Sequence, residues 1–263
     1  MVVKPDGDCL ICGSSADPSI EHIIPQALWL RFGLHPDSPD LERFRTRLCM
    51  PCNNATSRLH NSQGLLDLIE DGGPATQKSL RQLTEWAVWV TLLLGLRTGD
   101  GVVPNDQARK MLNDRFGRDK KTSGLPPGIR VYAAQVGNYV DGATDYISHQ
   151  VGVECDGRIM LDHSGKPAGF TIGEQPITVS ESLGIGKLAL LVLPRTYTSG
   201  GGHKERLDAA ASTVGLTRIH PFPDSIPNLS PTNIDMRAVS QVFMPLGHGS
   251  DASLAPTALR HFL

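Results

Sequence analysis

The chain has 263 residues, of which 40% are hydrophobic and 20% are charged, and its formal net charge is −2. This length can bury a sizeable core and suits one large domain or two small ones. The balanced charge excludes a strongly basic protein that coats nucleic acid without specificity. The 5% aromatic content argues against an extended surface for base stacking. Any contact with nucleic acid would therefore come from a local patch.

No leader or membrane anchor is expected. The first eight residues are polar and no apolar stretch follows them, unlike a secretory signal. The longest apolar run covers residues 86–96 and is interrupted by Thr91 and Gly95. Since a helix needs about 20 residues to cross a bilayer, this run predicts a buried helix. We expect a soluble, cytoplasmic protein.

Residues 1–62 combine four of the five cysteines with many turn-forming residues and little periodicity. They predict a small module held together by a metal. A short helix is expected over residues 63–71. The Asp-Gly-Gly-Pro sequence at 71–74 then breaks the pattern and marks a boundary. We expect one domain over residues 1–72 and a second over residues 73–263.

The second domain begins with helices. Apolar residues at helical spacing cover both sides of residues 75–97, which predicts a central buried helix. A second helix is expected over residues 104–116, with Pro104 near its start.

Strands are expected from Ile129 onward. Residues 146–155 and 158–161 flank Asp156-Gly157, a typical two-residue hairpin turn. Residues 170–172 and 187–193 are further strand candidates, and helices are expected over 203–214 and 234–242. Pro and Gly predict mostly loop after His220. The fold class is therefore α+β: a small metal-stapled module, then a larger α+β domain with its helices first and a mainly antiparallel sheet after them.

The four clustered cysteines form two Cys-x-x-Cys pairs, Cys9 with Cys12 and Cys49 with Cys52. In a reducing compartment such pairs bind metal more often than they form disulfides, and four thiolates suit tetrahedral Zn²⁺. Two coincidental pairs of buried cysteines are the alternative. Because sulfur fills all four positions, this zinc would be structural and chemistry would occur elsewhere. Cys155 stands alone and is expected to be a buried structural cysteine.

A second motif lies between the two pairs. It contains Glu21 and His22 in the sequence Glu-His-Ile-Ile-Pro, and the second pair is followed directly by Asn53 and Asn54. This combination resembles the zinc-containing HNH endonucleases, which have a ββα-metal fold. A similar strand motif, Asp-His-Ile-Val-Pro-Gln, occurs in the HNH domain of the RNA-guided CRISPR nuclease. The resemblance covers only about residues 9–60.

The resemblance implies a nuclease that hydrolyses phosphodiester bonds. His22 would be the general base, which suits an imidazole because its ordinary pKa is near 6.5. Glu21 and Asn53 would be ligands of one catalytic Mg²⁺ or Mn²⁺. Strand alternation places Glu21 and His22 on opposite faces, so one side chain can reach the metal while the other meets the water. The zinc at Cys52 would fix the position of Asn53.

Two departures from the family pattern are visible. Most members have Asn five residues before the third cysteine, where this chain has Phe44. That Asn is thought to brace the loop of the histidine, so the chain has either another brace or weaker activity. Asn54 is a second candidate ligand, although the motif register favours Asn53. Without the motif, His22 would be a core or zinc-shell histidine, Glu21 a turn cap and Asn53 a helix N-cap.

Basic residues gather near the motif, with no acidic residue between the first and the last. Arginine suits phosphate contacts, so a nucleic-acid-binding surface is expected here. An ordinary solvated surface is the alternative. The proposed contacts are Arg43, Arg45, Arg47, Arg58 and Asn54.

Three functional hypotheses follow. In the first, the chain cuts nucleic acid, with DNA favoured over RNA. One site cuts one strand, so double-strand cutting would need a homodimer. In the second, the chain is a zinc-stapled binding module whose HNH site is inactive. In the third, the nuclease is latent and is switched on by a ligand or partner of the second domain. That domain, residues 73–263, could recognise the substrate, hold a dimer partner or sense a signal. HNH modules are often fused to such domains in restriction, phage and antiviral defence systems.

Overall fold

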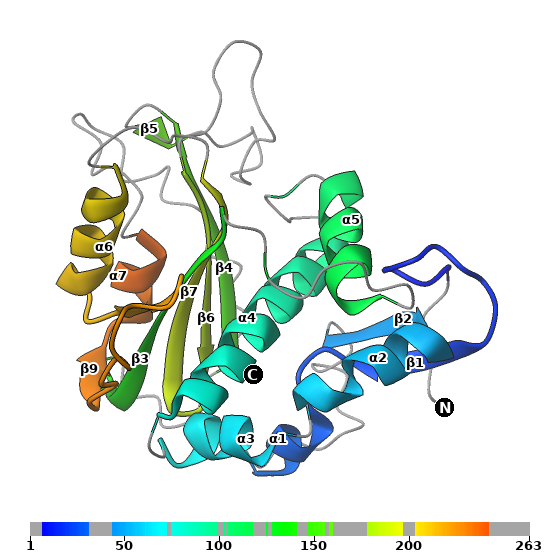
Figure 1. The fold of residues 1–263 in the computed structure, drawn as a ribbon, viewed down its shortest axis with the longest axis horizontal. Coiled ribbons are helices and arrows are strands. Elements are labelled where there is room, and N and C mark those ends of the chain that lie inside the picture. Colours follow the sequence, from blue (N-terminus) through cyan, green and yellow to red (C-terminus); the bar gives the residue numbers. More distant parts are fainter. Residues whose placement is uncertain are drawn as a thin grey trace.

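The computed structural model describes residues 7–31, 44–60, 62–72, 75–98, 103, 105–117, 125, 128–140, 147–155, 158–159, 178–196 and 203–241. The N-terminal part contains β1 (Pro18–His22), α1 (Gln26–Arg31), β2 (Arg45–Cys49) and α2 (Met50–His60). The two strands pair antiparallel, with Pro18 opposite Cys49 and His22 opposite Arg45. Helix α2 follows β2 directly and packs against both strands. The result is a two-stranded hairpin covered by one helix (Figure 1).

Three helices follow, namely α3 (Gln63–Glu70), α4 (Gln77–Thr98) and α5 (Asn105–Phe116). Helix α4 starts where Thr76 and Ser79 exchange backbone-to-side-chain hydrogen bonds of 2.9 and 3.1 Å, which satisfies two N–H groups of its first turn. Residues 86–95 of α4, which include Trp86 and Trp89, are all buried, so this part of the helix is enclosed on every side. Within the described ranges, no helix is both long enough and apolar enough to cross a bilayer.

The larger sheet has the strand order β5-β4-β6-β7-β3-β8, with β9 pairing with β3 off this path. Its strands are β3 (Arg130–Tyr139), β4 (Ile147–Cys155), β5 (Arg158–Ile159), β6 (Thr178–Ile185), β7 (Leu188–Thr196), β8 (Thr217–His220) and β9 (Thr232–Ile234). All of these pairs are antiparallel except β3 with β9. Two further helices, α6 (His203–Thr213) and α7 (Met236–Gln241), complete the fold.

The sheet lies between two helical layers (Figure 1), with α4 on one face and α6 and α7 on the other. Alternation along β3 supplies both cores: Val131 and Ala133 face α4, while Tyr132 and Ala134 belong to the opposite core. The core on the α4 side is continuous. It extends from Cys9 through α4 to the sheet, so the N-terminal module and the helices share one buried cluster.

The sequence predicted the α+β class, the helices and the mainly antiparallel sheet, and the structure confirms these features. The expected helix over residues 75–97 is α4, and that over residues 104–116 is α5. The two strands expected around Asp156-Gly157 are β4 and β5. Strand β6 was not expected, and the strand expected at residues 170–172 lies outside the described residues. The division at residues 72 and 73 stays a prediction.

A polar cluster joins α6 to the sheet. The Asp208 carboxylate accepts hydrogen bonds from Arg130 (2.8 Å), from the Tyr132 hydroxyl (2.9 Å) and from Arg218 (2.5 Å). Burial raises the pKa of Tyr132, so this phenol stays protonated and donates. Arg130 is only 6% exposed. Its buried positive charge would be uncompensated without the Asp208 carboxylate.

We predict that Asp208→Ala lowers the free energy of unfolding by ~1–3 kcal/mol, because it leaves the Arg130 guanidinium buried without its carboxylate. The lower part of this range is expected because Asp208 is itself about one-third exposed. The matched control is Lys110→Ala, which removes an exposed i,i+4 ion pair with Asp114 and should change stability by less than ~0.5 kcal/mol. Urea denaturation of both variants measures the difference. Equal stabilities would contradict the assigned role of Asp208.

Candidate metal centre and catalytic site

Four thiols meet where the N-terminal turn approaches the β2–α2 junction. Their sulfur atoms all lie within 4.8 Å of one another, and the Sγ atoms of Cys12 and Cys49 are 3.6 Å apart. With Zn–S bonds of about 2.3 Å, tetrahedral coordination requires sulfur atoms about 3.8 Å apart. The four cysteines are therefore placed to hold a metal ion such as zinc.

The first Cys-x-x-Cys pair forms a tight turn. The Gly13 N–H donates to the Cys9 carbonyl (2.8 Å), and the Cys9 N–H donates to the Ser14 carbonyl (2.9 Å). Gly13 has φ = 74°, a left-handed conformation that suits glycine. This explains the Gly after the second cysteine.

Protonation of the thiols differs between positions. A hydrogen bond from Cys52, aided by backbone N–H groups, lowers the pKa of Cys9 to about 4 against the opposing effect of burial. Partial desolvation is the main cause that raises the pKa of Cys12. The cluster therefore favours at least one thiolate, and a divalent cation would favour the remaining deprotonations.

Strand β1 presents the two candidate catalytic residues on opposite faces. Glu21 is opposite Thr46 in the hairpin, and His22 is opposite Arg45. The pairing is unbroken over β1, and successive residues of a strand point to opposite faces, so Ser19 and Glu21 lie on one face while Ile20 and His22 lie on the other. Glu21 is 4% exposed, whereas His22 at the strand end is only half-buried. Both residues lie in a strand, as the alternation predicted from the sequence requires.

Asn53 is held against β1 from the first turns of α2. Its Nδ2 donates to Ser19 Oγ at 3.0 Å and to the Ile20 carbonyl at 3.4 Å. These contacts bring Asn53 to the strand that carries Glu21, on the face that Ser19 and Glu21 share. Asn54 is exposed one residue further along. The structure therefore brings together the regions that the sequence linked.

Phe44 occupies the position where the resembling family usually has Asn. Its side chain is 1% exposed and packs in the core, while its carbonyl accepts a hydrogen bond from the Ile23 N–H at 2.7 Å. Ile23 and Ile24 are fully buried in the same apolar core. Ile23, the residue after His22, is thus held by a backbone hydrogen bond and by apolar packing, and not by an Asn side chain.

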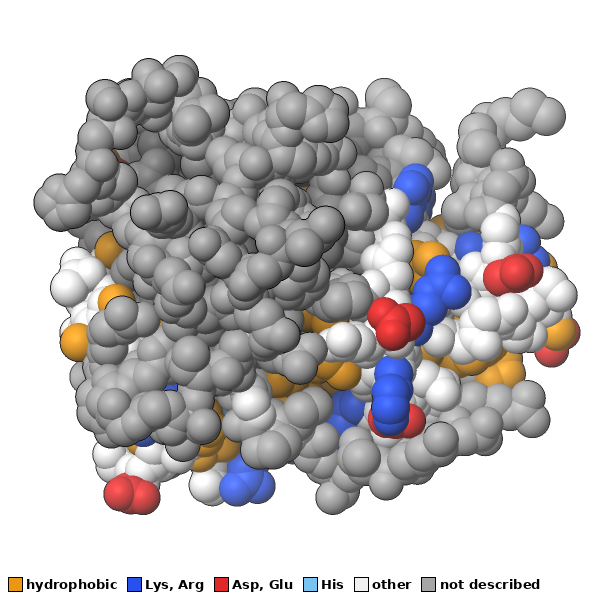
Figure 2. Space-filling view, turned by 90° about the horizontal axis from the view of Figure 1, so that it is seen from above, with side chains coloured by type: hydrophobic (Ala, Val, Ile, Leu, Met, Phe, Trp, Pro, Cys, Tyr) orange, Lys and Arg blue, Asp and Glu red, His pale blue; other side chains and the backbone are white. Residues whose placement is uncertain are grey.

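The expected basic surface is only partly described. Arg45 is 8% exposed, and Arg47 donates to the Ser15 carbonyl at 3.1 Å. Arg45 is therefore buried within the module, and the guanidinium of Arg47 is hydrogen-bonded to its N-terminal turn. Arg43 and the side chain of Arg58 lie outside the described residues. On the described part of the face in Figure 2, basic and acidic side chains alternate and do not form one basic patch.

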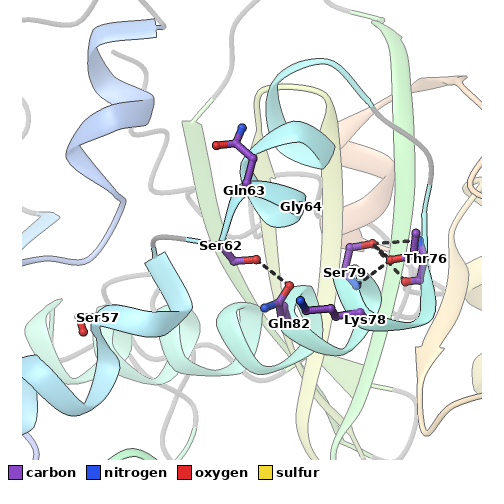
Figure 3. Close-up of a pocket in the computed structure, with 8 residues that line it drawn as sticks. All are labelled: Ser57, Ser62, Gln63, Gly64, Thr76, Lys78, Ser79 and Gln82. Carbon is purple, nitrogen blue, oxygen red and sulfur yellow. Dashed lines mark hydrogen bonds between the residues drawn. The ribbon is translucent and has the colours of Figure 1, made fainter.

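A polar groove of about 510 Å³ lies beyond the second half of α2 (Figure 3). Ser57, one helical turn after Asn53, lines it together with side chains from α3 and α4. Ser62 donates to Gln82 Oε1 at 2.6 Å across this groove. The lining contains one basic residue, Lys78, and no carboxylate. The full set is Ser57, Ser62, Gln63, Gly64, Thr76, Lys78, Ser79 and Gln82.

Ser19 and Lys78 were not predicted as site residues from the sequence. Ser19 could have been found, because strand alternation places it on the same face as Glu21 two residues later. Lys78 carried no such signal. Its place near α2 depends on how α3 and α4 fold back, which local patterns do not reveal.

We predict that Cys49→Ser removes the bound zinc and destabilises the N-terminal module, because three thiolates do not complete a closed tetrahedral site. Elemental analysis should give one zinc per wild-type chain and a clear loss in the variant, with a lower thermal unfolding midpoint. The control is Cys155→Ser, which changes the cysteine outside the two pairs and should keep the zinc. Full zinc content in Cys49→Ser would refute the four-thiolate site.

Compared with known proteins, this chain matches no protein-family model, no curated protein and no solved structure.

Proposed function

We propose that this chain is a metal-dependent endonuclease of the HNH type that hydrolyses phosphodiester bonds, with DNA favoured over RNA. The observation that carries the proposal is the position of Asn53. A helix that follows a four-cysteine cluster holds this amide against the strand of Glu21 and His22. Two paired strands followed by a helix, β1, β2 and α2, are the arrangement expected for a ββα-metal module, with the short helix α1 between the strands.

Glu21 and Asn53 are the proposed protein ligands of a catalytic Mg²⁺ or Mn²⁺, since both supply oxygen atoms. Such a cation, when bound, would neutralise negative charge on the scissile phosphate and the leaving oxygen. His22 takes a proton from the attacking water, and its half-buried position at the strand end is compatible with access to solvent. The zinc is structural and fixes the start of α2.

The test is cleavage of plasmid DNA with Mg²⁺ or Mn²⁺. We predict that His22→Ala lowers the rate by about 10²–10⁴-fold, which is typical for the loss of a general base. Glu21→Ala and Asn53→Ala should raise the metal concentration required for cleavage. The control is His220→Ala, because His220 lies on β8 outside the hairpin and α2. Zinc content should be equal in all variants.

If His22→Ala cut DNA as fast as the wild type, the nuclease proposal would fail. The same reactions with single-stranded RNA decide the preference between DNA and RNA. Sedimentation during cleavage tests whether a homodimer accompanies double-strand cutting.

The second candidate is a zinc-stapled binding module with an inactive HNH site. The low exposure of Glu21 favours it, because a buried carboxylate is less accessible to a hydrated cation. This candidate requires that wild type and His22→Ala bind nucleic acid equally and that neither cuts. Cleavage restored by a cell extract would instead support a latent nuclease in restriction or phage defence.

We also propose that the substrate backbone extends from Asn53 along α2 into the groove at Ser57. Ser57 lies one helical turn, about 6 Å, beyond Asn53 on the same side of α2. Lys78 is exposed in this groove, and an acid-free lining does not repel phosphate.

In the His22→Ala background, Lys78→Ala should weaken binding to a short DNA duplex roughly uniformly across sequences. It should also lower the slope of log affinity against log salt by about 1. Lys110→Ala, which removes an equal charge on α5, is the control and should leave the slope unchanged. Identical salt slopes for Lys78→Ala and its parent would exclude Lys78 from the binding path.

A further inference from the structure

The side-chain amide of Asn53 has two ends of different chemistry. Its nitrogen can only donate hydrogen bonds and its oxygen can only accept them, so only the oxygen can bind a cation. Both acceptors of the nitrogen are on β1, namely Ser19 Oγ and the Ile20 carbonyl. Within the described part of the chain, Oδ1 of Asn53 meets no donor. The orientation of this amide therefore decides whether an oxygen ligand is available.

Ser19 sets this orientation through its single proton. The Ser19 hydroxyl donates to the Leu48 carbonyl of β2 at 3.0 Å, and a carbonyl can only accept. Because the proton is used there, Ser19 turns a lone pair toward Asn53. The Ile20 carbonyl adds a second acceptor on the same side. A flipped amide would place Oδ1 against two oxygen atoms, so the nitrogen must face β1.

The backbone of Asn53 is fixed separately. Cys52 belongs to the four-cysteine cluster, and the Thr56 hydroxyl donates to the Asn53 carbonyl at 2.9 Å. These contacts hold the main chain of α2 but leave the rotation of the amide undetermined. Ser19 therefore has a role that the zinc cannot fulfil.

We propose that Ser19 is a positioning residue. It accepts the Nδ2 hydrogen bond of Asn53 while it donates to Leu48, and so presents Oδ1 as the ligand atom of the catalytic cation. Glu21 stands two residues further along the same face of β1, about 6.6 Å away along the strand. This inference rests on the proposed nuclease function for the identity of the ligand, but the orientation of the amide can be tested without it.

The first experiment measures Mn²⁺ binding to the full-length zinc-loaded protein by electron paramagnetic resonance. Ser19→Ala should weaken Mn²⁺ binding roughly ten- to a hundredfold, the usual effect of losing a group that orients a ligand. Ser19→Thr keeps a hydroxyl and should restore binding to within about threefold of the wild type. The control is Thr213→Ala, whose hydroxyl bonds within α6 to the Ala210 carbonyl. Zinc content should be equal in all four proteins.

The second experiment separates orientation from general stability. A carboxylate has two equivalent oxygens, so Asn53→Asp leaves no end for Ser19 to select. Ser19→Ala should therefore weaken Mn²⁺ binding at least tenfold in the wild-type background but less than about threefold in the Asn53→Asp background. If the role of Ser19 were purely structural, Ser19→Ala would weaken Mn²⁺ binding by the same factor in both backgrounds. That result would overturn the inference.

A third readout needs no divalent cation. In ¹⁵N-labelled protein, the Asn53 side-chain amide protons should exchange slowly with solvent in the wild type and in Ser19→Thr, and faster in Ser19→Ala. Equal exchange in all three would overturn the inference even if the nuclease proposal held. If the wild type bound no Mn²⁺, the ligand role of Oδ1 and the catalytic proposal would both fail. Altered exchange would then still support the assigned hydrogen bond.

Discussion

The structure of the N-terminal module depends on the closure of four sulfur atoms into one group. The turn at Cys9 and Cys12 and the β2–α2 junction at Cys49 and Cys52 contribute these atoms. Their approach within 4.8 Å therefore joins two segments that are 37 residues apart in the sequence. The fixed junction sets where α2 begins and brings Asn53 beside β1. Small modules with a modest apolar core often need such a staple. Here the staple and the apolar core act together, since Cys9, Cys49 and Cys52 are themselves buried.

Much of this arrangement could be predicted because it is encoded locally. The spacing of the cysteines predicted the four-thiol group, and periodicity predicted α4 and α5. The alternation of Glu21 and His22 follows from strand geometry alone. The failures have physical reasons. Arg45 looks like a surface cation in the sequence, but its place opposite His22 in the hairpin buries it. The contact of Arg47 with Ser15 and the groove at Lys78 arise from tertiary folding, which neighbouring residues do not specify.

Phe44 shows how one structural task can be met by different chemistry. An Asn side chain at this position would secure the histidine loop by hydrogen bonds. In this chain the Phe44 carbonyl accepts a hydrogen bond from the Ile23 N–H, and Phe44, Ile23 and Ile24 are buried in the same apolar core. Burying a side chain of this size contributes about 1.5–3 kcal/mol, which is comparable with two neutral hydrogen bonds. The absence of Asn at this position is therefore weak evidence against the proposed nuclease function, because a backbone hydrogen bond holds Ile23 instead.

The larger part of the chain packs directly against the N-terminal module. Helix α4 contacts α2 on one side and the sheet on the other, and one continuous apolar cluster includes all three. Near the end of α4, Arg97 donates to the Arg45 carbonyl at 3.1 Å, on the strand residue opposite His22. Packed interiors deform little, so a displacement of α4 would be transmitted to β2. A ligand of the sheet that regulates cutting would therefore have to favour one position of α4 over another, because only differential affinity shifts such an equilibrium.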